Sequence, residues 1–132
     1  MSNIDNMFKY QGKTTKVIGP SRTRIYKELY DHVSSLQGNK LPFNGNYLGD
    51  NELAQNIYEK KYYLKDIEAN LIENSPEDVF KRLSSFLATV EGTKAKQKKW
   101  AQKFYEQLFE GYFIPGGRVM AGAGDLYRLK TL

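Results

Sequence analysis

The glycine-rich, apolar segment at residues 113–132 (FIPGGRVMAGAGDLYRLKTL) limits the fold of this chain more than any other feature. It follows directly on a helix-forming stretch, and its apolar side chains recur with neither a helical nor a strand period. Glycine lets a backbone approach a neighbour closely and expose N–H groups to an anion. The run is not a P-loop, because no Gly-Lys-Ser/Thr follows it, and it lacks the glycine spacing of a Rossmann turn. We therefore expect an extended exit from a helical domain, in close backbone packing or against a phosphate.

Amphipathic helices are predicted for much of the preceding chain. The best-marked helix begins at Ser75, whose side chain is placed to accept the N–H of Asp78, with Pro76 at the first helical position and Asp78 completing a capping box. This helix is expected to end at Gly92, and its apolar stripe comprises Val79, Leu83, Phe86, Leu87 and Val90. Three further helices are predicted over residues 21–37, from a cap at Asp50 or Asn51 onward, and over residues 96–110.

The segments between these helices predict turns and boundaries. Residues 62–73 (YYLKDIEANLIE) contain two short β-prone runs and predict a small hairpin, with Asn70 in its left-handed position. Residues 1–20 show no sustained period, so we expect an arm that holds a short strand at most. Residues 38–51 are dense in Gly, Asn and Pro and predict a loop. The predicted fold is mainly α: a small antiparallel helical domain with one β-hairpin, followed by an extended Gly-rich segment.

The composition excludes several kinds of site. The chain has 132 residues, no cysteine and one histidine, His32, so disulfides and thiolate metal sites are excluded and no metal site is expected. No apolar run approaches the roughly 20 residues of a membrane span, and the N-terminus resembles no signal peptide, so we expect a cytoplasmic protein without membrane contact. The net charge of +5 permits contact with nucleic acid or an acidic partner, although basic runs are more often solvated. No catalytic residues can be assigned.

The motif PGGRVMAGAG at residues 115–124, followed by TL at 131–132, resembles the entry into the catalytic barrel of ribonucleotide reductases. The likeness is greatest to the adenosylcobalamin-dependent (class II) enzymes, and the order of elements over residues 52–132 is similar to their small helical N-terminal domain. In that family the next strand carries the first catalytic cysteine. The resemblance thus implies the front part of a ribonucleoside-diphosphate reductase, which makes deoxyribonucleotides for DNA replication. The Gly-rich segment would lead into an α/β barrel that is missing here, so the chain alone is expected to be inactive.

The same resemblance implies which residues lie at the substrate. Gly117 matches the position beside the substrate diphosphate, where many members have Ser or Thr, and would contribute only its backbone. Arg118 would either face a phosphate or pair with a helix carboxylate. The implied substrate-binding residues are Gly116, Gly117, Arg118, Met120, Ala121 and Gly122.

Cofactor, partners and domains follow from the resemblance as expectations. Adenosylcobalamin is the implied cofactor, bound mainly by a C-terminal reductase fragment that would be the partner of this chain, and the complete enzyme would form a homodimer. Residues 1–50 are expected to be an unassigned arm plus one helix, 51–112 the reductase helical domain, and 113–132 the start of the barrel. Two alternatives stay open: a fragment of a class I large subunit, or a stand-alone basic helical module that binds nucleic acid or another protein.

Overall fold

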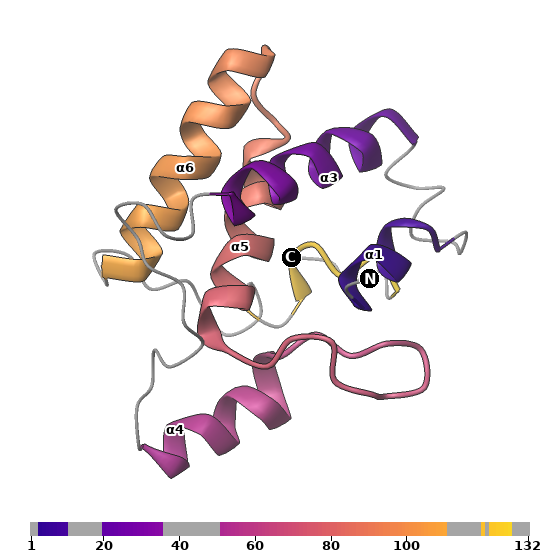
Figure 1. Ribbon diagram of the computed structural model, residues 1–132, viewed down its shortest axis with the longest axis vertical. Coiled ribbons are helices and arrows are strands. Elements are labelled where there is room, and N and C mark those ends of the chain that lie inside the picture. The colour runs from indigo at the N-terminus through magenta and orange to yellow at the C-terminus, as the bar shows by residue number, and fades with distance from the viewer. Residues whose placement is uncertain (1–2, 11–19, 36–50, 111–119, 121, 128–132) are drawn as a thin grey trace.

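The protein is mainly α-helical, as predicted (Figure 1). The structure, a computed structural model, describes residues 3–10, 20–35, 51–110, 120 and 122–127. No helix among these residues is long and apolar enough to cross a membrane. The elements are α1 (Asn3–Phe8), α3 (Pro20–Ser34), α4 (Glu52–Ile57), the π-helix η1 (Tyr58–Tyr62), α5 (Pro76–Ala88) and α6 (Lys94–Glu110).

Helix α5 begins with the predicted cap. The Ser75 hydroxyl accepts the N–H of Asp78 at 3.4 Å, and Pro76 is the first helical residue. The Asp78 carboxylate reaches back one residue further than a capping box requires and accepts the N–H of Asn74 at 3.2 Å. The helix ends at Ala88 and not at Gly92, so the predicted place of Val90 in the buried stripe is wrong: it lies beyond the helix and is 71% exposed.

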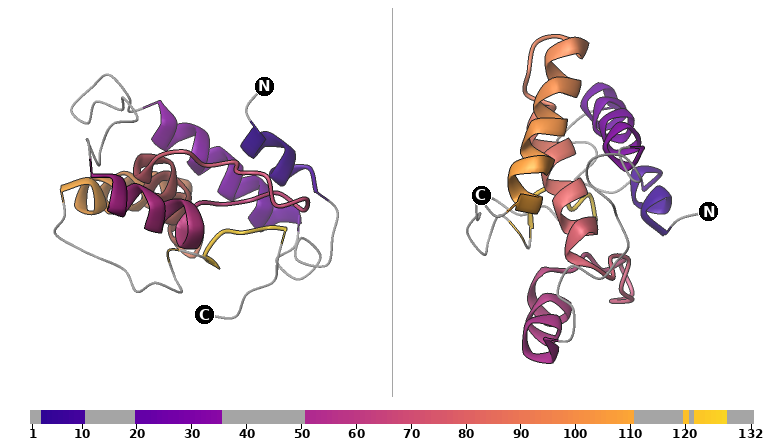
Figure 2. Two further views of the ribbon diagram at one scale, coloured as in Figure 1. Left: turned by 90° about the horizontal axis from the view of Figure 1, so that it is seen from below. Right: turned by 60° about the vertical axis from the view of Figure 1, so that its left-hand side comes forward.

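Helix α5 is the centre of the helical layer, with α6 and α3 packed against it (Figures 1 and 2). The short connection at residues 89–93 returns the chain, so α5 and α6 run antiparallel, as predicted. Burial of apolar side chains between these helices is the main stabilising term, at roughly 1.5–3 kcal/mol for each large side chain before entropy costs. The buried residues of this cluster are Leu29, Val33, Tyr63, Val79, Phe80, Leu83, Ala88, Ala101, Tyr105, Leu108, Met120 and Ala123.

The predicted N-terminal arm is wrong for residues 3–8, which form helix α1. Its side chains Ile4, Met7 and Phe8 are buried in a second apolar cluster together with Leu64 and Leu126. Six residues are too few to give a periodic signal above background, and the helix is held by tertiary packing instead of by intrinsic propensity. Residues 11–19 of the predicted arm lie outside the described part of the chain.

The predicted hairpin at residues 62–73 is not supported, because the described residues contain one isolated antiparallel bridge, between Lys65 and Leu71, and no strand. The connection is organised by Asp66, whose Oδ1 accepts the N–H groups of Glu68 and Asn70, each at 2.9 Å. The left-handed residue is Ala69, with φ of 68°, and not Asn70 as predicted. With both flanking N–H groups fixed by one carboxylate, the residue between them takes the unusual conformation.

Helix α4 begins where predicted but stands apart from the rest of the molecule. The Asn51 side chain accepts the N–H of Ala54 at 3.0 Å, and the helix continues directly into η1. It lies beyond the end of α5 at which that helix begins, away from α3 and α6 (Figure 1). Neither α4 nor η1 contains a buried residue.

We predict that Met7→Ala lowers the free energy of unfolding by about 2–5 kcal/mol, because Met7 is fully buried and its truncation leaves a cavity. Chemical denaturation of the purified chain measures the change. Val90→Ala is the matched control, expected to stay within about 0.5 kcal/mol of wild type because Val90 is exposed. Equal stability of the Met7 variant and wild type would contradict the place of α1 in the core.

We also predict cooperative unfolding in alkali. Burial is the main cause that raises the pKa of Tyr26, Tyr30, Tyr63 and Tyr105 above the ordinary value of 10.0. Above that pH the unfolded chain releases these protons while the folded chain keeps them, so stability is full below pH 10 and falls as pH rises. In an alkaline titration, tyrosinate absorbance and helical circular dichroism should change together at a pH above 10.0. Ionisation of all ten tyrosines with the helices intact would refute this account.

Candidate functional site

Two of the six residues predicted at the substrate site, Met120 and Gly122, lie in the described part of the chain; Gly116, Gly117, Arg118 and Ala121 lie outside it. Where it is described, the Gly-rich exit is not extended as predicted. Met120 and Gly122 have helical backbone, and the Asp125 N–H closes the turn that follows by donating to the Gly122 carbonyl at 3.2 Å. We call residues 120 and 122–127 the Gly-rich turn.

A buried arginine on α5, Arg82, is the main contact of the Gly-rich turn with the helical domain. It lies three residues after Val79 and four before Phe86, so it falls on the buried face of α5, and 0% of it is exposed. A buried cation is expensive unless it is paired and its N–H groups have acceptors. The surroundings of Arg82 supply both.

Glu73 is the ionic partner of Arg82. The Arg82 Nε donates to Glu73 Oε2 at 2.8 Å and Nη2 donates to Oε1 at 3.2 Å, which makes a bidentate pair. The Glu73 side chain is itself buried, and its Oε1 also accepts the N–H of Leu64 at 2.9 Å. The pair therefore ties the 62–73 connection to the middle of α5.

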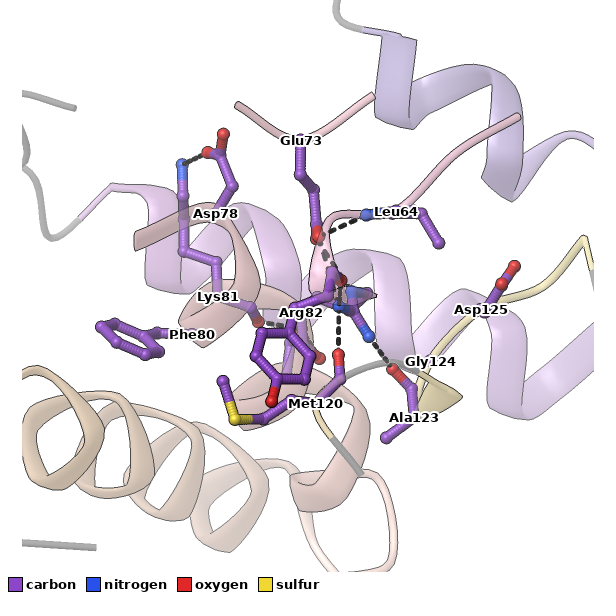
Figure 3. Close-up of polar contacts among 12 residues, drawn as sticks. Leu64, Glu73, Asp78, Phe80, Lys81, Arg82, Met120, Ala123, Gly124 and Asp125 are labelled. Atoms are coloured by element: carbon purple, nitrogen blue, oxygen red, sulfur yellow. Dashed lines mark hydrogen bonds and ion pairs between the residues drawn. The ribbon is translucent and has the colours of Figure 1, made fainter. Parts of the chain in front are cut away.

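The remaining N–H groups of Arg82 bind backbone carbonyls (Figure 3). Nη1 donates to the Ala123 carbonyl at 2.6 Å, and Nη2 donates to the Met120 carbonyl at 2.7 Å and to the Tyr62 carbonyl at 3.1 Å. One side chain of α5 thus joins the 62–73 connection to the Gly-rich turn, whose Ala123 lies 41 positions further along the chain. A planar, five-donor fork can do this, whereas a lysine offers one nitrogen.

Gly124 fits only as glycine. Its φ is +81°, which is unfavourable for other residues, and an added Cβ would lie 2.6 Å from the Tyr26 Oη and 3.0 Å from the Arg82 Cγ. The Tyr26 hydroxyl donates to the Gly124 carbonyl at 2.8 Å. The Gly-rich turn is therefore held from two sides, by α5 and by α3.

The charges at this position are fixed over the physiological range. Burial alone would lower the pKa of Arg82, but the carboxylate of Glu73 outweighs it and the net pKa is raised, so the guanidinium stays charged. Burial raises the pKa of Tyr26, so its hydroxyl stays a donor. The Asp125 Oδ1 accepts the Tyr127 N–H at 3.0 Å. Arg82 and Tyr26 therefore hold backbone carbonyls and keep their protons near neutral pH.

His32 lies on the flank of α3, half-buried in its last turn. Burial, with a smaller contribution from Lys98, lowers the pKa of this imidazole. Within the described ranges no group of three or more His, Cys, Asp or Glu side chains could hold a metal ion. The described site therefore consists of backbone carbonyls of the Gly-rich turn that are fixed by Arg82 and Tyr26.

Arg82 was missed from the sequence because charged residues on helices are usually exposed. Its signal is positional: it falls inside the apolar stripe between Val79 and Phe86, and a glutamate precedes the helix cap by two residues. Such an arginine inside a stripe indicates a buried ion pair once the helix is assigned.

We predict that Arg82→Met lowers the free energy of unfolding by about 3–5 kcal/mol, because it leaves the Glu73 carboxylate buried without its cation. Thermal or denaturant melts measure it. The control is Asp31→Asn, which removes an exposed ion pair with Lys27 at 3.0 Å and should cost less than about 1 kcal/mol. If the two variants were equally stable, the central role of Arg82 would be excluded.

Comparison with known proteins gives one match. The sequence profile of the family described as "Ribonucleotide reductase, all-alpha domain" matches residues 48–128, more than half of the chain. Searches among curated proteins and among solved structures gave no match. The matched range contains α4, η1, α5, α6 and the Gly-rich turn, and it leaves α1 and α3 outside. The chain therefore belongs to the ribonucleotide reductase all-alpha domain family, which forms the N-terminal region of the reductase large subunit.

Proposed function

We propose that this chain works with a C-terminal reductase fragment to convert ribonucleotides to deoxyribonucleotides. The observation that carries the proposal is the seating of the Gly-rich turn on the family's helical domain by Arg82, which binds the Met120 and Ala123 carbonyls. The described residues of the motif, 120 and 122–124, are thus fixed to the helical domain through the Met120 and Ala123 carbonyls. We assign the chain the role of a rigid wall of the substrate site.

The reducing groups would come from the partner. The chain contains no cysteine, so it can neither carry a thiyl radical nor supply the cysteine pair that is oxidised when a ribonucleotide is reduced. We propose that the C-terminal fragment brings these cysteines to the wall formed here. The assembled enzyme would act in the cytoplasm as a homodimer.

The substrate contacts proposed for Gly116, Gly117, Arg118, Met120, Ala121 and Gly122 rest on the resemblance of the motif. The Met120 side chain is not available for the substrate, because it is buried in the helical core, and the Met120 carbonyl is bound by Arg82. Any contribution of Met120 to substrate binding would therefore come through the position of its backbone. Arg118 would supply the charge that meets a phosphate.

Adenosylcobalamin as the cofactor is a further proposal, supported by the likeness of residues 115–124 to the class II motif. The described residues give no support for such a site on this chain: they contain no group of three or more His, Cys, Asp or Glu side chains that could hold a metal ion, and Arg82 and Tyr26 already bind Glu73 and the Gly124 carbonyl. We therefore assign cobalamin binding to the C-terminal fragment and propose no contact between the cofactor and the described residues. The class I large subunit is the alternative.

Reconstitution tests the proposed function. We expect neither the purified chain nor a C-terminal reductase fragment from the same genome to reduce ribonucleoside di- or triphosphates alone. Their mixture, supplied with adenosylcobalamin and a dithiol reductant, should form deoxyribonucleotides. If activity required a class I radical-generating subunit and not adenosylcobalamin, the chain would belong to a class I reductase. Turnover by the isolated chain, or failure of the pieces to assemble, would reject the proposal and favour the stand-alone module.

A further inference from the structure

A helix outside the family match reaches the Gly-rich turn. Helix α3 precedes the matched range of residues 48–128, yet the hydroxyl of its Tyr26 donates to the Gly124 carbonyl at 2.8 Å. The bond joins residues 98 positions apart and is buried, and Tyr26 itself is 0% exposed. This contact therefore connects an element that precedes the matched range with a segment inside that range.

The ring of Tyr26 is held firmly enough to place its hydroxyl. It packs edge to face against Phe8, with ring centroids 4.8 Å apart, and against Phe86 at 5.2 Å. Helix α3 is tied to α5 beside it, because the Arg22 Nε donates to the Thr89 Oγ1 at 2.9 Å and the Arg22 guanidinium lies 4.9 Å from the centre of the Phe86 ring. The hydroxyl thus has little freedom to follow a moving backbone.

Tyr26 and Arg82 hold successive peptide groups. Arg82 binds the Ala123 carbonyl and Tyr26 binds the Gly124 carbonyl. Because a trans peptide is planar, a fixed carbonyl also fixes the direction of the N–H on the other side of the same plane. Glycine at φ +81° has many alternative conformations to lose, so two anchors on adjacent carbonyls restrict the turn strongly.

We propose that Tyr26 is a positioning residue for the ribonucleotide site: by binding the Gly124 carbonyl, it holds the Gly-rich turn in the conformation that accepts substrate. The proposal rests on the proposed function of the chain as one wall of a reductase. A preorganised backbone binds its ligand more tightly because less ordering is required on binding. Helix α3 then supports the Gly-rich turn from outside the matched range.

Tyr26→Phe tests the proposal, because it removes the hydroxyl and keeps the ring packing. The control is Tyr30→Phe, which removes another buried hydroxyl one turn further along α3, where the ring contacts Phe8 and Lys81. Both variants should keep the helical circular dichroism of wild type. In the assembled enzyme we expect Tyr26→Phe to raise KM for the ribonucleotide by about three- to tenfold, a loss of one hydrogen bond, with a much smaller change in kcat. Tyr30→Phe should change neither constant.

A second readout uses the chain alone. The carbonyl carbon of Gly124 should shift upfield in the NMR spectrum of Tyr26→Phe and stay in place in Tyr30→Phe, because only the first variant removes its hydrogen-bond donor. An active wild-type assembly in which Tyr26→Phe leaves KM unchanged overturns the role of Tyr26 and leaves the proposed function standing. An inactive wild-type assembly overturns both. An unmoved Gly124 carbonyl overturns the contact itself.

Discussion

The buried ion pair between Arg82 and Glu73 is the constraint on which the rest of the structure depends. Taking both charges out of water is costly, and the cost is offset because every nitrogen of the guanidinium and both oxygens of the carboxylate have hydrogen-bond partners. Those partners are the backbone groups of Tyr62, Leu64, Met120 and Ala123. The requirement to satisfy one buried cation therefore draws the connection before α5 and the Gly-rich turn after α6 to the same place on α5.

The packing of the two ends of the chain follows from this arrangement. Once Arg82 has drawn the Gly-rich turn onto α5, Leu126 lies in the apolar cluster that also contains Met7 and Tyr26. Helices α1 and α3 therefore share a core with the last described residues, and closing so long a loop costs chain entropy that the burial must exceed. The Gly-rich turn is therefore restricted by its contacts with Arg82 and Tyr26, because glycine itself does not restrict the backbone.

Local signals in the sequence located the capped helix starts, but they missed α1, predicted a hairpin where the structure has one isolated bridge, and did not reveal the site. The caps at Asn51 and Ser75 mark the starts of two helices correctly because capping depends on neighbouring residues alone. The left-handed Ala69 could not be foreseen, because the Asp66 carboxylate and not the preference of the residue decides it. The acceptors of Arg82 were missed for a related reason. They lie up to 41 positions away, and a helical period contains no information on contacts at that separation.

Native-state hydrogen exchange at the Asp125 and Tyr127 amides tests the central claim most directly. These N–H groups bind within the Gly-rich turn, to the Gly122 carbonyl and to the Asp125 carboxylate. If the turn is released only when the Arg82 pair breaks, both amides should exchange with the same opening free energy as the core amides of α5. Exchange at the rate of an unprotected peptide, while α5 stays protected, would show that the turn opens independently and that Arg82 does not hold it.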